Sequence, residues 1–211
     1  MKLITYNIHK GIDENNNESL NDTIDYLKRT NADIICLQEV LNSIHIKLLN
    51  ELDINGYFLS NVKLTNDLYG ISIYFKNDMV SVDGVHLVSE KERRGFIHLQ
   101  LYINDKLVNI INLHLGLSIY EREKQLEQVL NYVDTLRGKN IICGDFNQTD
   151  LKIDKFYDLA KIFDLENTET FSKSKSRIDY IFISQNINPT KYIVDFITTS
   201  DHFPVIGEFN I

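Results

Sequence analysis

The segment Asn7-Ile8-His9-Lys10-Gly11 recurs in the second half of the chain as Asn112-Leu113-His114-Leu115-Gly116. Each copy follows an apolar run rich in β-branched residues and precedes a polar loop and an amphipathic helical stretch. A second apolar run then ends in acidic residues, at 34–39 in the first half and at 141–145 in the second. This spacing predicts two strand–helix–strand units, one in each half of the chain.

Helices are predicted within and after these units. Ser19-Leu20-Asn21-Asp22 resembles a capping box, so the first helix is expected to begin after Ser19. In the second unit Arg137-Gly138 supplies the predicted helix stop, and a further short helix is expected over 44–52. The apolar residues at helical spacing are Leu20, Ile24 and Leu27 in the first unit, and Leu126, Val129, Leu130 and Val133 in the second.

The other apolar runs are predicted to be strands, because they are rich in β-branched and aromatic residues and are separated by charged or Asn-Asp turns. They cover 57–59, 70–75, 79–88, 96–103, 107–113, 178–183, 192–197 and 205–209. Two sheets with helices on one side each can bury their bare faces against each other. We therefore expect a four-layer α/β/β/α sandwich of two packed mixed sheets with an internal pseudo-twofold repeat.

The composition indicates one globular domain over residues 1–211, with two prolines and no linker-like stretch. The net charge of −8 disfavours tight non-specific nucleic-acid binding, because basic residues that neutralise phosphates supply most of that affinity. Cys36 and Cys143 lie in apolar runs and are expected to be buried thiols. Neither a signal-peptide pattern nor a membrane-spanning stretch is seen, so a cytoplasmic protein without membrane insertion is expected. The oligomeric state stays open.

Polar residues stand at the ends of the apolar strands several times. Taken singly, each is an ordinary turn residue, because Asn and Asp commonly form turns after strands. Asp179 differs, since it lies inside an apolar segment and needs a polar partner there. Together these side chains suit a hard cation and a phosphate. The strand-end residues are Asn7, Glu39, His114, Asp145, Asn147, Asp201 and His202.

Six short segments resemble motifs of the endonuclease/exonuclease/phosphatase superfamily, to which deoxyribonuclease I belongs. They occur in the family's order and span nearly the whole chain. The resemblance implies the four-layer fold and an active site at the strand ends. The segments are Thr5-Tyr6-Asn7-Ile8, Leu37-Gln38-Glu39-Val40, Asn112-Leu113-His114-Leu115, Gly144-Asp145-Phe146-Asn147, Arg177-Ile178-Asp179-Tyr180-Ile181 and Ser200-Asp201-His202-Phe203-Pro204-Val205.

The resemblance implies a metal site and a catalytic group. Glu39 is the first candidate ligand for Mg²⁺, with Mn²⁺ as a possible substitute, and Asn7 and Asp201 would complete or flank that site. Mg²⁺ usually takes one or two carboxylates and completes its shell with water and substrate oxygens. The resemblance also assigns Asp145 to the attacking water, Asn147 to the scissile phosphate, and His202, oriented by Asp179, to a phosphoryl oxygen.

His114 is expected near the scissile phosphate or as an acid for the leaving group, as in family phosphodiesterases with an Asn-x-His segment. The chain has Tyr6 before Asn7 and no Trp, which disfavours a DNA-repair enzyme. His114-Leu115-Gly116-Leu117, followed by Glu121-Arg122 and Gln125, looks like an uncharacterised bacterial branch. Weaker candidates for substrate binding are Arg94, Tyr69 and His9.

Four functions are therefore weighed. Mg²⁺-dependent hydrolysis of a phosphodiester by in-line attack of an activated water is favoured. A DNA endonuclease or exonuclease and a sugar- or inositol-phosphate phosphomonoesterase are alternatives, and a catalytically silent binding domain is the least favoured. The substrate itself and the number of metal ions cannot be inferred from the sequence.

Overall fold

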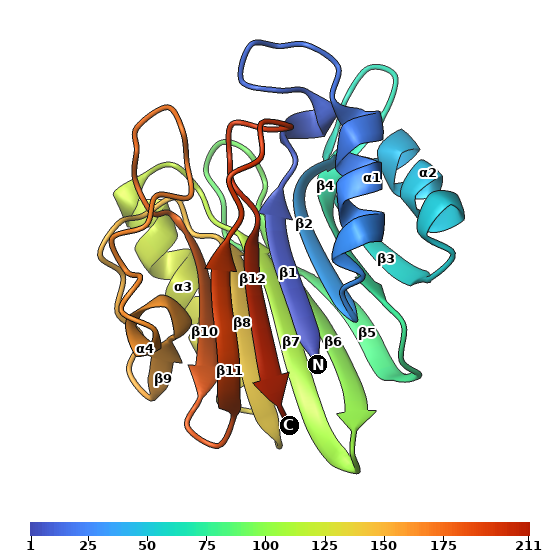
Figure 1. Cartoon of the computed structure of the whole chain (residues 1–211). Coiled ribbons are helices and arrows are strands. Elements are labelled where there is room, and N and C mark those ends of the chain that lie inside the picture. The colour runs from blue at the N-terminus through green and yellow to red at the C-terminus, as the bar shows by residue number, and fades with distance from the viewer.

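The computed structural model describes all residues from 1 to 211. Two six-stranded mixed sheets pack face to face, with helices on the outer sides (Figure 1). Helices α1 (Leu20–Thr30) and α2 (Asn42–Leu52) cover the first sheet, and α3 (Ile119–Val133) covers the second. The short helix α4 (Leu159–Ile162) buries Leu159 and Ala160 in the core between the sheets. The predicted four-layer sandwich is confirmed.

The first sheet has the strand order β11-β12-β1-β2-β4-β3, in which only β1 and β2 are parallel. Helix α1 forms the crossover between these two parallel strands. The strand bounds are β1 Lys2–Asn7, β2 Ile34–Leu41, β3 Asn55–Lys63, β4 Leu68–Phe75, β11 Asn188–Val194 and β12 Val205–Asn210.

The second sheet has the order β5-β6-β7-β8-β10-β9, with β7 and β8 as its only parallel pair and α3 as the crossover. Its pattern of parallel and antiparallel neighbours matches that of the first sheet, position by position. The repeated motif thus lies at the equivalent ends of β1 and β7. The bounds are β5 Met79–His86, β6 Gly95–Ile103, β7 Lys106–His114, β8 Lys139–Asp145, β9 Phe156–Asp158 and β10 Asp179–Ser184.

Alternation along the strands explains the layers. In β2, Ile34 and Cys36 point into the core between the sheets, whereas Ile35 and Leu37 face α1 and α2. Cys143 lies in the same central core as Cys36, so both cysteines are buried thiols as predicted. Burial of apolar area on both faces of each sheet supplies most of the folding free energy.

Several local predictions were wrong. Ser19 precedes α1, but it makes no capping hydrogen bond, because its hydroxyl donates to the Thr199 carbonyl at 2.6 Å. Helix α3 ends at Val133, before the predicted stop at Arg137-Gly138. Strand β9 and helix α4 were not foreseen, because each is too short to show a periodic pattern. No helix in the structure combines the length and the hydropathy that crossing a membrane requires.

A buried polar bridge joins the two sheets near the strand ends. The amide of Gln38 in β2 donates to Asn112 Oδ1 in β7 at 2.7 Å and to Thr5 Oγ1 at 3.0 Å. The Asn112 amide donates in turn to the carbonyls of Ser72 at 2.8 Å and Leu37 at 3.2 Å. Because all these groups are shielded from water, each needs its partner, and the bridge fixes how the sheets align.

Replacing Asn112 with leucine is expected to destabilise the protein by about 2 to 4 kcal/mol, because two carbonyls and the Gln38 amide would lose a buried partner. Urea unfolding followed by circular dichroism measures this. The double variant Gln38→Met/Asn112→Leu should be more stable than Asn112→Leu alone, since it removes one of the stranded groups. Equal stability of the wild type and Asn112→Leu would contradict the importance of this bridge.

Candidate active site

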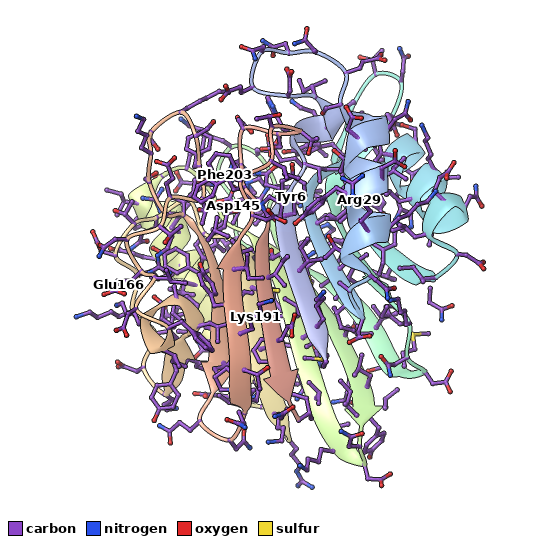
Figure 2. The ribbon with its side chains drawn as sticks, in the orientation of Figure 1. Tyr6, Arg29, Asp145, Glu166, Lys191 and Phe203 are labelled. Carbon is purple, nitrogen blue, oxygen red and sulfur yellow. The ribbon has the colours of Figure 1, made fainter.

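The strand ends that carry the predicted residues meet at one end of the sandwich, below the connecting loops. Figure 2 labels Asp145 there, at the same end as Tyr6 and Phe203. Sheet register explains part of this convergence. On one side Asp145 at the end of β8 pairs with His114, the last residue of β7, and on the other side it pairs with Asp179, the first residue of β10.

Asp145 is the centre of this cluster. Its Oδ2 accepts a hydrogen bond from the Asn7 amide at 3.0 Å and lies 3.5 Å from His114 Nε2 and 3.8 Å from His202 Nε2. Its Oδ1 accepts the backbone N–H of Asn147 at 2.9 Å. Burial, and then the nearby Asp179 charge, raises the pKa of Asp145 to about 7. The group is therefore poised to take up or release a proton near neutral pH.

His202 is paired with Asp179, as predicted. Its Nδ1 donates to Asp179 Oδ2 at 2.9 Å, and its ring packs against Phe171 with centroids 4.7 Å apart. Burial by itself lowers the pKa of His202, but the Asp179 and Asp145 carboxylates outweigh it and raise the pKa to about 10. His202 is thus a charged donor with its Nε2 directed toward the cluster.

Glu39 reaches the site through an irregularity in β2. The pairing of β2 with β4 shifts register between Leu37 and Val40, and Glu39 adopts a left-handed φ of 55°. Such a conformation costs a non-glycine residue on the order of 1–3 kcal/mol. Glu39 Oε1 lies 3.4 Å from the same Asn7 nitrogen that contacts Asp145. One amide nitrogen therefore lies between two carboxylates.

These donors fit a divalent cation. Asp145, Asp179 and His202 offer ligand atoms that lie within 4.8 Å of one another, and Asp179 Oδ1 is buried without a hydrogen-bond partner. However, His202 Nδ1 already donates to Asp179, and a hard cation prefers oxygen ligands to a charged imidazole. Glu39 and Asp145, joined through Asn7, offer an oxygen set beside this trio.

Arg94 lies behind His114. Its Nη1 donates to His114 Nδ1 at 3.2 Å and to Glu92 Oε1 at 2.7 Å. Because a guanidinium has no acceptor, Nδ1 of His114 must accept, which leaves the proton on the Nε2 that faces Asp145. Burial, then Arg94 and His202, holds the pKa of His114 well below its ordinary value, so this histidine is neutral. The structure thus places Arg94 where it sets the tautomer of His114.

The other predicted residues lie around this centre. Asp201 Oδ2 accepts from Lys173 at 2.8 Å, and its Oδ1 lies 3.5 Å from His9 Nδ1. The Asn147 amide donates to the Leu115 carbonyl at 2.9 Å, with a left-handed φ of 51° at Asn147. Tyr69 is buried, and its pKa is raised by that burial and by the charges of Glu39 and Glu92.

The sequence did not point to Phe171 or Lys173, which complete the site from the loop before β10. Phe171 packs on His202, and Lys173 pairs with Asp201. Neither residue lies in a strand or in one of the six motifs, so no pattern signalled it. Ser200 was quoted within a motif but given no role, although its hydroxyl donates to the Asn7 carbonyl at 2.8 Å.

Comparisons with known proteins agree with this geometry. The model of the endonuclease/exonuclease/phosphatase family matches residues 4–202. YbhP of Escherichia coli K12, described as uncharacterised, is 30% identical over 173 aligned residues, which cover 69% of this chain and 66% of YbhP, just under two thirds.

Two solved structures share the fold. The endonuclease/exonuclease/phosphatase of Beutenbergia cavernae has a TM-score of 0.85 at 17% identity, over 100% of this chain and 71% of that chain. The mannosyl-6-phosphatase Bt3783 of Bacteroides thetaiotaomicron has a TM-score of 0.81 at 17% identity, over 100% of both chains.

Two paired sheets with acids and histidines at their joined strand ends define a protein of the deoxyribonuclease I-like class. The chain belongs to the endonuclease/exonuclease/phosphatase family, whose members are usually metal-dependent phosphoesterases.

The buried carboxylate of Asp145 should cost stability in the metal-free protein. An unfolded Asp releases its proton near 3.8, whereas folded Asp145 holds it to about 7, so its contribution to stability falls as pH rises between these values. Asp145→Asn should remove this dependence and raise the unfolding free energy at pH 8 by about 1 to 3 kcal/mol. Chemical denaturation in EDTA across pH 4 to 8 measures it.

The exposed Asp154 provides the matched control. Asp154→Asn should follow the wild type at every pH. If the unfolding free energies of the wild type and of Asp145→Asn depend on pH in the same way, the carboxylate of Asp145 is solvated rather than buried.

Proposed function

We propose that this protein hydrolyses a phosphoester in a Mg²⁺-dependent reaction, with a phosphodiester as the favoured substrate. The observation that carries the proposal is the placement of one buried carboxylate, Asp145, within 3.8 Å of two histidine Nε2 atoms. A base flanked by two donors matches what in-line attack of water on a phosphate needs: activation of the nucleophile and stabilisation of the charge that develops.

Glu39 would hold the metal ion, with Asn7 and Asp201 completing or flanking the site, and Mn²⁺ is a possible substitute. When bound, the ion supplies Lewis-acid polarisation of a phosphoryl oxygen. The residues present suit it, because Mg²⁺ prefers carboxylate oxygens, and Asn7, whose own oxygen accepts from the His9 N–H, would flank the site with its amide nitrogen. Relief of repulsion among the buried carboxylates would add to the binding free energy.

Asp145 orients the attacking water and accepts its proton. With a pKa of about 7, its ionised form is populated at neutral pH and still basic enough to be useful. His202, charged and oriented by Asp179, donates from Nε2 to a phosphoryl oxygen as negative charge develops. Asn147 would position the phosphate with the amide hydrogen that its bond to Leu115 leaves free.

His114 suits an alkoxide leaving group, which alkyl diesters and sugar monoesters share, so the preference for a diester rests on the resemblance of the Asn-x-His segment to that of family phosphodiesterases. The neutral ring of His114 presents an Nε2–H toward the cluster, where it can donate to the leaving oxygen. An alkoxide is a poor leaving group, so its departure depends on a proton donor more than the departure of a good leaving group does. Hydrolysis of a sugar phosphate monoester is the second candidate, because Bt3783, described as a mannosyl-6-phosphatase, shares the fold over its whole length.

His202→Ala is expected to lower turnover by about 10²–10³, the usual effect of losing one preorganised donor, and Asp145→Ala by at least as much. Release of p-nitrophenol from bis-p-nitrophenyl phosphate measures diester hydrolysis, and p-nitrophenyl phosphate measures monoester hydrolysis. Supercoiled plasmid and an abasic-site duplex test the nuclease alternative. Activity that persists unchanged in Asp145→Ala would come from a contaminant.

Metal binding can be tested without turnover. At a Mg²⁺ or Mn²⁺ concentration about 100 times the Kd, binding should stabilise the wild type by about 2.7 kcal/mol, seen as a higher melting temperature. Glu39→Gln should lose most of this shift. Glu166→Gln is the matched control, because Glu166 lies far from the strand ends that carry Asp145 (Figure 2). An equal shift in Glu39→Gln would remove Glu39 from the metal site.

A further inference from the structure

A hollow lies between the end of β3 and the loop that joins β5 to β6. Its volume is about 680 Å³. Both sheets contribute to it, because β3 belongs to the first sheet and the loop joins two strands of the second. Its polar lining consists of Asn61, Lys63, Ser89, Lys91, Glu92 and Arg93.

The hollow carries uncompensated positive charge. Lys63, Lys91 and Arg93 are exposed, and no carboxylate lies within 4.0 Å of their charged nitrogens. The one acid in the lining, Glu92, is engaged by Arg94 at 2.7 Å. In a chain with a net charge of −8, this is a local site for an anion.

Asn61 adds an unpaired polar group to the same hollow. It occupies a bulge, where the pairing of β3 with β4 shifts between Ser60 and Val62. The residue is only 5% exposed, yet its Oδ1 has no hydrogen-bond partner. A buried amide oxygen without a partner is costly, and because less than 1 Å² of this oxygen is accessible, a ligand hydroxyl would relieve that cost only with a small shift of the bulge.

The loop that carries two of the cations is held in place by α3. Glu121 Oε1 accepts the backbone N–H of Glu90 at 2.6 Å, and the Gln125 amide donates to the Val88 carbonyl at 2.9 Å. Ser89 Oγ accepts the Arg94 N–H at 3.0 Å and closes the loop on itself. The cations are thus presented on a preorganised segment, which lowers the entropy lost when a ligand binds.

This hollow is connected to the reaction centre through a short series of contacts. Glu92 pairs with Arg94, Arg94 donates to His114, and His114 Nε2 lies 3.5 Å from Asp145 Oδ2. Arg93 directly precedes Arg94 in the chain, so these contacts link the hollow to the centre at which the first phosphate would bind. An extended nucleic acid would need a longer basic track than three side chains.

We propose that the hollow formed by Asn61, Lys63, Lys91 and Arg93 binds a second phosphate group of a small hydroxylated substrate whose first phosphate is hydrolysed at Asp145. The inference rests on the second candidate of the proposed function, hydrolysis of a sugar phosphate monoester, and it names the substrate class of that same site. It distinguishes a bisphosphorylated sugar or polyol from a substrate with a single phosphate.

Binding can be measured without turnover. Glucose 1,6-bisphosphate is titrated into the protein in EDTA by calorimetry at low salt. The double variant Lys63→Ser/Arg93→Ser should bind about 10-fold or more weakly than the wild type, because charge-assisted contacts to phosphate are lost. The control Lys106→Ser/Lys191→Ser changes the net charge equally, and Lys191 lies on β11 away from the strand ends (Figure 2). It should bind like the wild type.

Turnover provides the second readout. With Mg²⁺, the ratio of kcat/KM for glucose 1,6-bisphosphate to that for glucose 6-phosphate should fall about 10-fold in Lys63→Ser/Arg93→Ser. Equal binding and an equal ratio in the wild type and this variant would overturn the subsite while leaving the proposed hydrolysis intact. Binding lost in the variant, with no hydrolysis of either sugar phosphate by the wild type, would support the subsite and overturn monoester hydrolysis as the reaction of this site.

A single-stranded oligonucleotide is the remaining probe. If it binds the wild type and loses affinity in Lys63→Ser/Arg93→Ser, while the bisphosphate does not bind, the hollow serves a nucleic acid and the small-molecule inference is wrong. Weak oligonucleotide binding that does not respond to the variant supports the inference.

Discussion

The hydrogen bond from the Asn7 amide to Asp145 joins the two sheets at the centre of the candidate site. Asn7 ends β1 in the first sheet, and Asp145 ends β8, one of the two parallel strands of the second sheet. The apolar core below this bond sets how far apart the two strand ends lie, and the Gln38–Asn112 bridge sets their alignment. The order of a site that is divided between two sheets depends on the packing between those sheets. The core therefore positions the site as well as stabilising the fold.

That packing also holds like charges together. Asp145 and Asp179 are both nearly inaccessible to solvent, and only part of their charge is balanced by His202. Hydrated carboxylates would separate, but the strand register prevents it, because the two residues are paired directly across β8 and β10. Stability is therefore lost at this point, a compromise that is common where an enzyme carries its active site.

The sequence was sufficient to predict the architecture and most of the residues that surround Asp145. Both predictions follow from the periodic spacing of apolar residues in strands and helices and from the polar residues at the strand ends. The alternating strands, the two crossover helices and the duplicated motif predicted the two sheets. The positions of Asp145, Asp179 and His202 near strand ends predicted that their side chains lie together. The sequence was not sufficient where geometry depends on distant loops. Lys173 and Phe171 come from an irregular segment whose path is set by tertiary contacts. The Ser19 hydroxyl bonds to Thr199, far along the chain, which no local capping rule can foresee.

The irregularity at Glu39 has a consequence for the whole tip of β2. Up to Leu37 the strand alternates strictly between the central core and the helical side, but Val40, which strict alternation would turn inward, packs with α2 instead. After the extra residue, the even-numbered side chain of Val40 faces the helices, whereas before it even-numbered side chains of β2 face the central core. Deleting that one residue would restore regular pairing and leave Val40 opposite Gly70, so the acid could be removed without turning the side chains that anchor α2.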